Sequence, residues 1–192
     1  MLAWAGYSRI RRRWPTRRWL AWVLILAGIS SICQGKVYLT QEEALRSAFP
    51  PPLQVERKTL FLDDAQAAGV ERAAGSPLKG RVFSYYIGRN AQGVQGYAYF
   101  DTHLVRTLPE TIMVLLGSDG SIRRVEVLSF SEPEDYLPRG PWLEQFTGRS
   151  LDDEMALRRG IHNLAGASLT AEAVTAACRR ILALHRLAAG PR

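Results

Sequence analysis

The stretch from Thr111 to Phe130 reads TIMVLLGSDGSIRRVEVLSF and predicts a β-hairpin. Thr111 to Leu116 is almost continuously apolar, as expected of a strand that is buried on both faces. Gly117 to Ser121 contains the glycine and aspartate residues that favour tight turns. Ile122 to Phe130 then alternates apolar and polar side chains, which indicates a second strand. A hairpin of this kind pairs its strands antiparallel, so we expect an antiparallel sheet.

Segments before the hairpin extend this sheet. Arg81 to Gly88 (RVFSYYIG) and Tyr97 to Asp101 (YAYFD) are rich in aromatic residues and alternate in polarity. The intervening segment from Asn90 to Gly96 contains glycines and is expected to form the turn between them. Leu53 to Leu62 is a further strand-like run.

Helical segments surround these strands in the sequence. A capping-box pattern from Thr40 to Glu43 (TQEE) opens the first helix. The expected helices are Thr40 to about Ala48, Asp63 to about Gly75, Trp142 to Phe146, and about Thr170 to Leu187. The expected fold class is therefore α+β, a small antiparallel sheet packed with helices.

Positive charge is concentrated at the N-terminus. The 192 residues include 25 lysines and arginines against 18 aspartates and glutamates, which gives a net charge of +7. Six arginines precede the first acidic residue, Glu42; they are Arg9, Arg11, Arg12, Arg13, Arg17 and Arg18. The rest of the chain is nearly neutral. Because a nucleic-acid-binding surface spreads its positive charge over the folded domain, we expect no nucleic-acid partner.

An apolar segment follows the arginines directly. Trp19 to Gly35 contains no charged residue, and Trp19 to Ile32 (WLAWVLILAGISSI) is almost wholly apolar. Its length is compatible with a short transmembrane helix and with the core of a signal peptide. Thr16 to Leu20 (TRRWL) also loosely resembles a twin-arginine export signal. We favour a retained anchor, because Cys33 and Gly35 make a poor cleavage site.

Arginines beside an apolar helix stay in the cytoplasm, so an anchor and a signal peptide both export the remaining chain. The expected organisation is a cytoplasmic segment 1–18, a transmembrane anchor or signal sequence 19–36, and an extracytoplasmic domain 37–192. As an anchored chain, this is a single-pass protein of the inner (cytoplasmic) membrane whose C-terminal domain faces the periplasm.

Most motifs of catalytic and metal sites are missing from the sequence. The histidines at positions 103, 162 and 185 have no second ligand at the spacing of zinc sites, so no metal site is predicted. The chain lacks the nucleophile elbow, the phosphate-binding P-loop and the dinucleotide-binding glycine motif. Cys33 and Cys178 fit no zinc or redox spacing, and Cys178 lies on an apolar helical stripe. We therefore assign no catalytic residue.

The segment from Asn163 to Glu172 (NLAGASLTAE) leads into the last helix and places Ser168 or Thr170 at its N-terminus. One interpretation is that either hydroxyl simply caps the helix. The other is that the free backbone amides of this helix end hold a phosphate, while Gly166 and Ala167 keep bulky side chains away from it. Residue spacing alone does not choose between them.

The run from Ala165 to Thr170 (AGASLT), with Ala173-Val174-Thr175 beyond it, resembles the S-G-A-T-x-T-S…A-V motif of the FMN-binding domain family. That family includes flavin-carrying components of the sodium-pumping NADH:quinone oxidoreductase and of the Rnf electron-transport complex, and the membrane regulator of nitrous-oxide reduction. Similarity to the family's other motifs extends over much of the exported domain, at Thr40 to Pro50, Asp119-Gly120, Phe130 to Pro133, Tyr136, Trp142 and Gln145-Phe146.

The resemblance implies a function and a site. In the family, the last serine or threonine of the motif carries FMN through a phosphoester bond, which a flavin transferase installs outside the cytoplasm. The matching residue here is Ser168. The implied protein is a membrane-anchored flavoprotein that relays electrons, with a flavin transferase and a membrane redox complex or cytochrome as partners. The implied cofactor-binding residues are Ser168, Gly166, Ala167, Leu169, Thr170, Glu132 and His103, with Arg106 as an alternative to His103 beside the flavin ring.

Two positions differ from the family pattern, since Ala165 stands where serine is common and His162 where aspartate is common. Two alternative functions follow. A degenerate relative would keep the fold as a flavin-free interaction or regulatory module. A flavin-dependent reductase would need a proton donor beside the flavin, for which His103 is the only hint in the sequence.

Overall fold

The computed structural model describes residues 35–190. The predicted cytoplasmic segment 1–18 and all but the last two residues of the predicted segment 19–36 lie outside the described residues. Among residues 35–190, no helix is both long enough and apolar enough to cross a bilayer.

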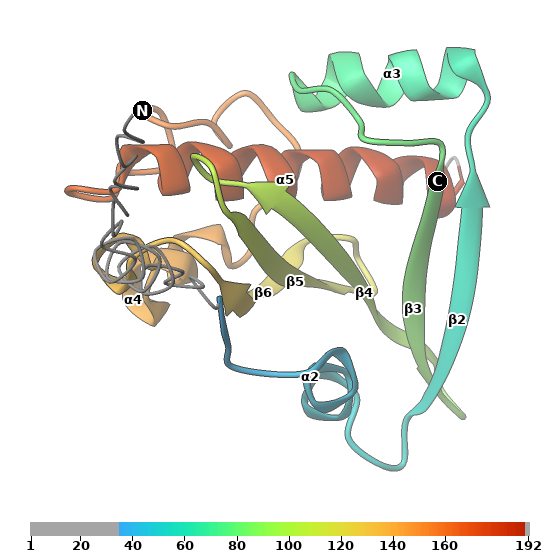
Figure 1. Cartoon of the computed structure of the whole chain (residues 1–192). Coiled ribbons are helices and arrows are strands. Elements are labelled where there is room, and N and C mark those ends of the chain that lie inside the picture. The colour runs from blue at the N-terminus through green and yellow to red at the C-terminus, as the bar shows by residue number, and fades with distance from the viewer. Residues whose placement is uncertain (1–34, 191–192) are drawn as a thin grey trace, which may run out of the picture. The chain divides into compact units, whose positions relative to one another are not determined.

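Six strands form one antiparallel sheet in the order β1-β6-β5-β4-β3-β2 (Figure 1). Their bounds are β1 Lys36–Val37, β2 Gln54–Phe61, β3 Val82–Asn90, β4 Gly93–Leu104, β5 Pro109–Gly117 and β6 Ile122–Phe130. The hairpin expected from Thr111 to Phe130 is confirmed as β5 and β6, which pair with two register shifts.

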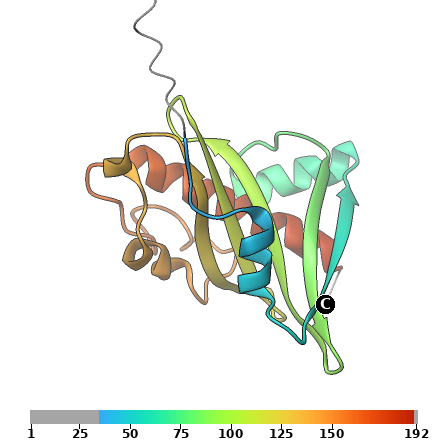
Figure 2. The same cartoon turned by 60° about the horizontal axis from the view of Figure 1, so that its bottom comes forward.

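Helices cover both faces of this sheet. Their bounds are α2 Gln41–Ala48, α3 Asp64–Ala74, α4 Gly140–Leu143 and α5 Ser168–Ala188, with short 3-10 helices at η1 Glu134–Tyr136 and η2 Glu144–Phe146. The long helix α5 crosses one face of the sheet with α3 beside it, and α2 lies on the opposite face (Figures 1 and 2). The expected α+β class is confirmed.

The apolar run in β5 follows from this double coverage. Ile112, Val114 and Leu116 pack into the larger core cluster beneath α5, and Met113 packs into the smaller cluster beneath α2. All four are 0% exposed. Because side chains alternate across a strand, only a strand buried on both faces needs apolar residues at every position.

The first helix is held against the sheet by a close contact. The capping box of Thr40 and Glu43 is present as expected. Phe49, which caps the C-terminus of α2, lies directly against Gly88, where an added Cβ would overlap the phenyl ring. A second glycine, Gly96, has no room for a Cβ beside the carbonyl of Leu116. Both glycines therefore permit close packing on this face.

Two expected boundaries were wrong. β4 runs from Gly93 to Leu104, well beyond the expected Tyr97 to Asp101, because its ends pair with β3 and β5 despite their polar residues. This places His103 inside a strand and not in the loop expected between strands. The last helix begins at Ser168, two residues earlier than expected.

Candidate functional site

A cavity of about 320 Å³ lies at the N-terminus of α5. Three chain segments form it: the loop between β4 and β5, the segment that follows β6, and the residues that open α5. Its lining residues are Val105, Arg106, Glu132, Tyr136, Gly166, Ala167, Ser168, Leu169 and Thr170. The structure thus brings together six of the seven sequence-predicted site residues with Arg106, the predicted alternative to His103, and it adds Val105 and Tyr136. A volume of this size is at the lower end of the range for small-molecule pockets.

Ser168 is the first residue of α5 and is exposed. The N-cap is Ala167, and no side chain caps this helix, so the interpretation of Ser168 or Thr170 as an N-cap hydroxyl was wrong. The Ser168 hydroxyl instead accepts a hydrogen bond of 2.8 Å from Asn163 Nδ2. Backbone N–H groups in the first turn of a helix have no partner within the helix, so this end presents donors to the cavity.

The segment before α5 is held by the helical pieces that follow β6. The backbone N–H of His162 donates to Gln145 Oε1 (2.7 Å), and the Trp142 indole donates to the His162 carbonyl (2.9 Å). Gly166 has a φ of 77° in the left-handed region, and a Cβ there would meet open space. Sequence reasoning did not identify Asn163, Trp142 or Gln145 as positioning residues, because their partners are distant in sequence or belong to the backbone.

Thr170 contributes an unsatisfied polar atom to this site. The residue is 1% exposed, and its hydroxyl oxygen is buried without a hydrogen-bond partner among the described residues. A buried hydroxyl that lacks a partner costs about 1–3 kcal/mol. Because Thr170 also lines the cavity, a polar ligand could supply the missing bond.

Arg106 and Glu132 also line the cavity, but they differ in their contacts. Glu132 Oε1 accepts from the backbone N–H groups of Thr107 (2.9 Å) and Leu108 (3.0 Å). The Thr107 N–H in particular lowers the pKa of Glu132. Its carboxylate therefore fixes the loop between β4 and β5. The Arg106 guanidinium makes no hydrogen bond or ion pair within residues 35–190, so its charge is available to an anionic ligand.

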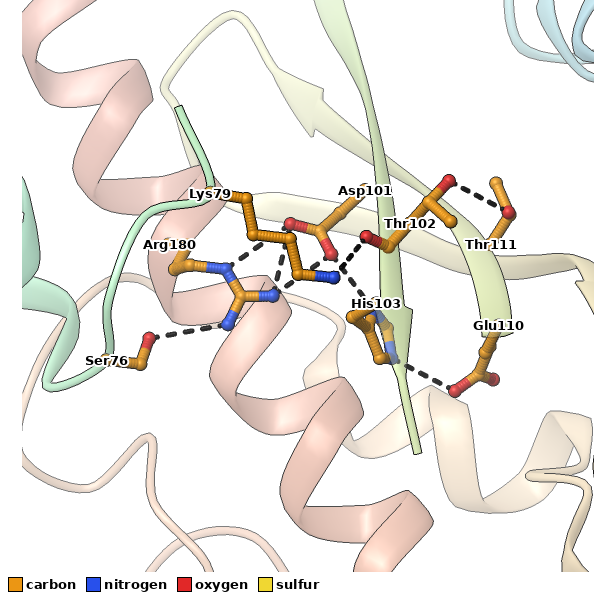
Figure 3. A network of polar contacts seen from close by, with 8 residues as sticks. All are labelled: Ser76, Lys79, Asp101, Thr102, His103, Glu110, Thr111 and Arg180. Carbon is orange, nitrogen blue, oxygen red and sulfur yellow. Dashed lines mark hydrogen bonds and ion pairs between the residues drawn. The ribbon is translucent and has the colours of Figure 1, made fainter. Parts of the chain in front are cut away.

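His103 is the one predicted site residue that does not line the cavity. It is 4% exposed and belongs to a buried chain of ionisable groups (Figure 3). Its Nδ1 lies 2.9 Å from Asp101 Oδ1, and its Nε2 lies 3.1 Å from Glu110 Oε2. Arg180 of α5 donates to Asp101 at 3.0 Å. With both ring nitrogens engaged, His103 has no hydrogen-bonding atom left for a ligand.

The partners of His103 were only partly predictable from the sequence. Asp101 and His103 are two residues apart in β4, and Glu110 pairs with His103 across the sheet. Residues two apart in a strand share a face, so the spacing of Asp101 and His103 was a usable signal. The contribution of Arg180 from α5, 79 positions away, was not.

The chain of buried groups shifts the pKa of each member. Burial disfavours ionised Asp101, but the His103 hydrogen bond and the charge of Arg180 outweigh it and lower the pKa of Asp101. Burial also opposes protonation of His103, but hydrogen bonds to Asp101 and Glu110 prevail and raise the pKa of His103. For Glu110, burial dominates and raises the pKa.

These directions predict how stability depends on pH. The raised pKa of His103 contributes stability that is fully present below about pH 6.5 and is lost as the pH rises through the folded-state pKa. Glu110 acts in the same direction, starting from about pH 4.3. The lowered pKa of Asp101 contributes stability above about pH 3.9, which is lost on acidification. We expect the free energy of unfolding to decrease between about pH 6 and pH 9.

Urea denaturation of the full chain in detergent at several pH values measures this decrease. His103→Gln removes this titrating group and should flatten much of the decrease. An equally steep decrease in the free energy of unfolding of His103→Gln would contradict the assignment of this pH dependence to His103.

Comparison of the chain with protein-family models, with curated proteins and with solved structures finds no match.

Proposed function

We propose that this protein is a membrane-anchored, extracytoplasmic flavoprotein that carries FMN on Ser168 and relays electrons. One observation supports this most strongly. The exposed hydroxyl of Ser168 shares a cavity with the unsatisfied buried hydroxyl of Thr170 and the unpaired cation of Arg106.

The residues present are compatible with a flavin phosphate. Ser168 would carry the flavin phosphate through its hydroxyl oxygen, to which Asn163 Nδ2 donates a hydrogen bond. The first-turn amides of α5 and the guanidinium of Arg106 would balance the negative charge of the phosphate. FMN itself supplies one-electron and two-electron chemistry, so no catalytic side chain is required.

The cavity also has apolar surface for a planar ring. Val105, Tyr136 and Leu169 line it beside the polar groups. Aromatic and aliphatic side chains with a few placed polar groups are the usual composition of cofactor sites. The reductase alternative gains no support, because His103 is outside the cavity and bonded at both ring nitrogens.

Co-expression of the full chain with a flavin transferase tests the proposal. We expect a yellow protein whose flavin absorbance and fluorescence remain with the polypeptide after denaturation. Flavin that is released on denaturation would indicate non-covalent binding. A colourless protein under these conditions would contradict the proposal and favour the flavin-free interaction module.

The family resemblance suggests a substitution that increases modification. His162 is exposed and its backbone is fixed by Gln145 and Trp142, so a change of its side chain should not disturb the fold. We expect His162→Asp, which restores the acid common at this position, to raise the modified fraction severalfold under limiting transferase. Intact mass spectrometry measures that fraction. His162→Asn is the matched control without the charge, and equal yields from both variants would show that the acid is not recognised.

A further inference from the structure

The chain joins the folded domain next to the cavity. Lys36 Nζ lies 2.7 Å from Glu134 Oε1, and Gly35 packs so closely on Ser131 that a Cβ would overlap its hydroxyl. Glu132 and Tyr136, which line the cavity, are within two residues of Glu134. Figure 2 shows β1 beginning beside the loop that connects β4 and β5. In the sequence, the apolar run that ends at Ile32 is only four residues from Lys36.

Exposed apolar side chains gather at the same end. Leu104 is 58% exposed, Leu169 is 51% exposed and Tyr136 is 40% exposed. Tyr136 and Leu169 line the cavity. Leu104 ends β4 directly before the cavity residue Val105, on the opposite face of the strand from His103. We call these three residues the apolar rim. Exposed apolar groups gathered at one end of a domain indicate a contact surface.

We propose that the apolar rim rests on the surface of the lipid bilayer that residues 19–36 enter, so that the cavity opens toward the membrane. We identify the bilayer as the contact partner because of where the chain joins the domain. One residue spans at most about 3.6 Å, so the four residues from the apolar run that ends at Ile32 to Lys36 in β1 span at most about 14 Å. This short connection would keep this end of the domain near the bilayer.

The chemistry of the rim fits a lipid interface. Tyrosine is enriched at the level of lipid headgroups, where its ring is apolar and its hydroxyl is hydrated. The unpaired guanidinium of Arg106 lies among the same residues and can pair with anionic headgroups. The largest exposed apolar side chain elsewhere, Phe61 at 71%, is on β2, at the opposite edge of the sheet from β1.

This contact does not require flavin, but its consequence for the electron partner rests on the proposed function. A cavity that opens toward the bilayer would exchange electrons with a membrane-embedded or lipid-soluble carrier. A freely diffusing extracytoplasmic protein would have poor access to it.

Spin labelling of the full chain tests the contact. In a Cys33→Ser background, nitroxides are attached separately to Leu104→Cys, Tyr136→Cys and Leu169→Cys, with Phe61→Cys as the matched exposed control. Cys178 is fully buried, and burial raises its pKa, so it should not react. The labelled chains are reconstituted in vesicles of phosphatidylethanolamine and phosphatidylglycerol, and collisions with oxygen and with a water-soluble nickel chelate are compared.

We expect the rim labels to collide mainly with oxygen, which concentrates in lipid, and the label at position 61 to collide mainly with nickel. Rim labels as accessible to nickel as position 61 would overturn the proposal. Shielding of the rim in native membranes but not in these vesicles would also overturn it and would indicate a protein partner. Flavin content is measured separately on unlabelled chains, so a failure of the proposed function would not be confused with a failure of the membrane contact.

Discussion

Replacing Ser168 with alanine is expected to abolish covalent flavin attachment completely. No other serine or threonine that lines the cavity is exposed, since Thr170 is 1% exposed and its hydroxyl oxygen is buried. Ser168→Thr keeps a hydroxyl at the first position of α5 and should retain most of the modification. After co-expression with a flavin transferase, the flavin fluorescence of the denatured chain and its intact mass measure the attached fraction.

Ser118→Ala is the matched control for this substitution. Ser118 is an exposed serine in the turn between β5 and β6, at the other end of the hairpin from the cavity. Its replacement should leave the flavin content unchanged. A Ser168→Ala chain that still carries covalent flavin would contradict the site, even if the protein is a flavoprotein.

Replacing Asp101 with alanine is expected to cause a large loss of stability. The carboxylate accepts from both His103 and Arg180, whose side chains are only 5% and 11% exposed. Its removal leaves a buried cation without its acceptor. Breaking a buried ion pair from one side costs about 3–5 kcal/mol. Urea denaturation of the full chain in detergent measures the change in the free energy of unfolding.

An exposed ion pair provides the control. Glu42 pairs with Arg46 along α2, and both side chains are more than half exposed. Glu42→Ala should cost no more than about 1 kcal/mol. Equal losses of stability from Asp101→Ala and Glu42→Ala would show that the buried ionisable groups around Asp101 contribute no more to stability than a surface ion pair. The double variant Asp101→Ala, Arg180→Leu should recover part of the loss, because it also removes the unpaired cation.

Much of the fold was predictable from local sequence signals. The apolar run from Thr111 to Leu116 and the turn after it required a central hairpin, and they now form β5 and β6. The capping box at Thr40 correctly marked the start of α2. These signals act over a few residues, where turn chemistry and side-chain alternation determine structure directly.

Features that depend on distant contacts were not predictable. Thr102, His103 and Leu104 were not predicted as strand residues, and they extend β4 because they pair with β5. Motif resemblance predicted Gly166 to Thr170 and Glu132 as cavity residues, with Arg106 as an alternative, but not Val105 or Tyr136. The cavity's other wall comes from loops whose approach depends on the whole sheet.

The place where the chain enters the domain, at Lys36, was likewise not predictable from the sequence. Lys36 and Glu134 are 98 residues apart, and only the pairing of β1 with β6 brings them together. That pairing places Lys36, the last residue of the predicted segment 19–36, beside Glu134 and near the cavity, and it is the basis of the membrane contact proposed above.

Peptide mapping by mass spectrometry tests the central claim most directly. The full chain is co-expressed with a flavin transferase, purified from membranes, digested and sequenced by fragmentation. We expect the peptide that contains Ser168 to carry one FMN through a phosphoester, with fragment ions that place it on that serine. A Ser168 peptide that is entirely unmodified, or FMN found on another residue, would contradict the claim.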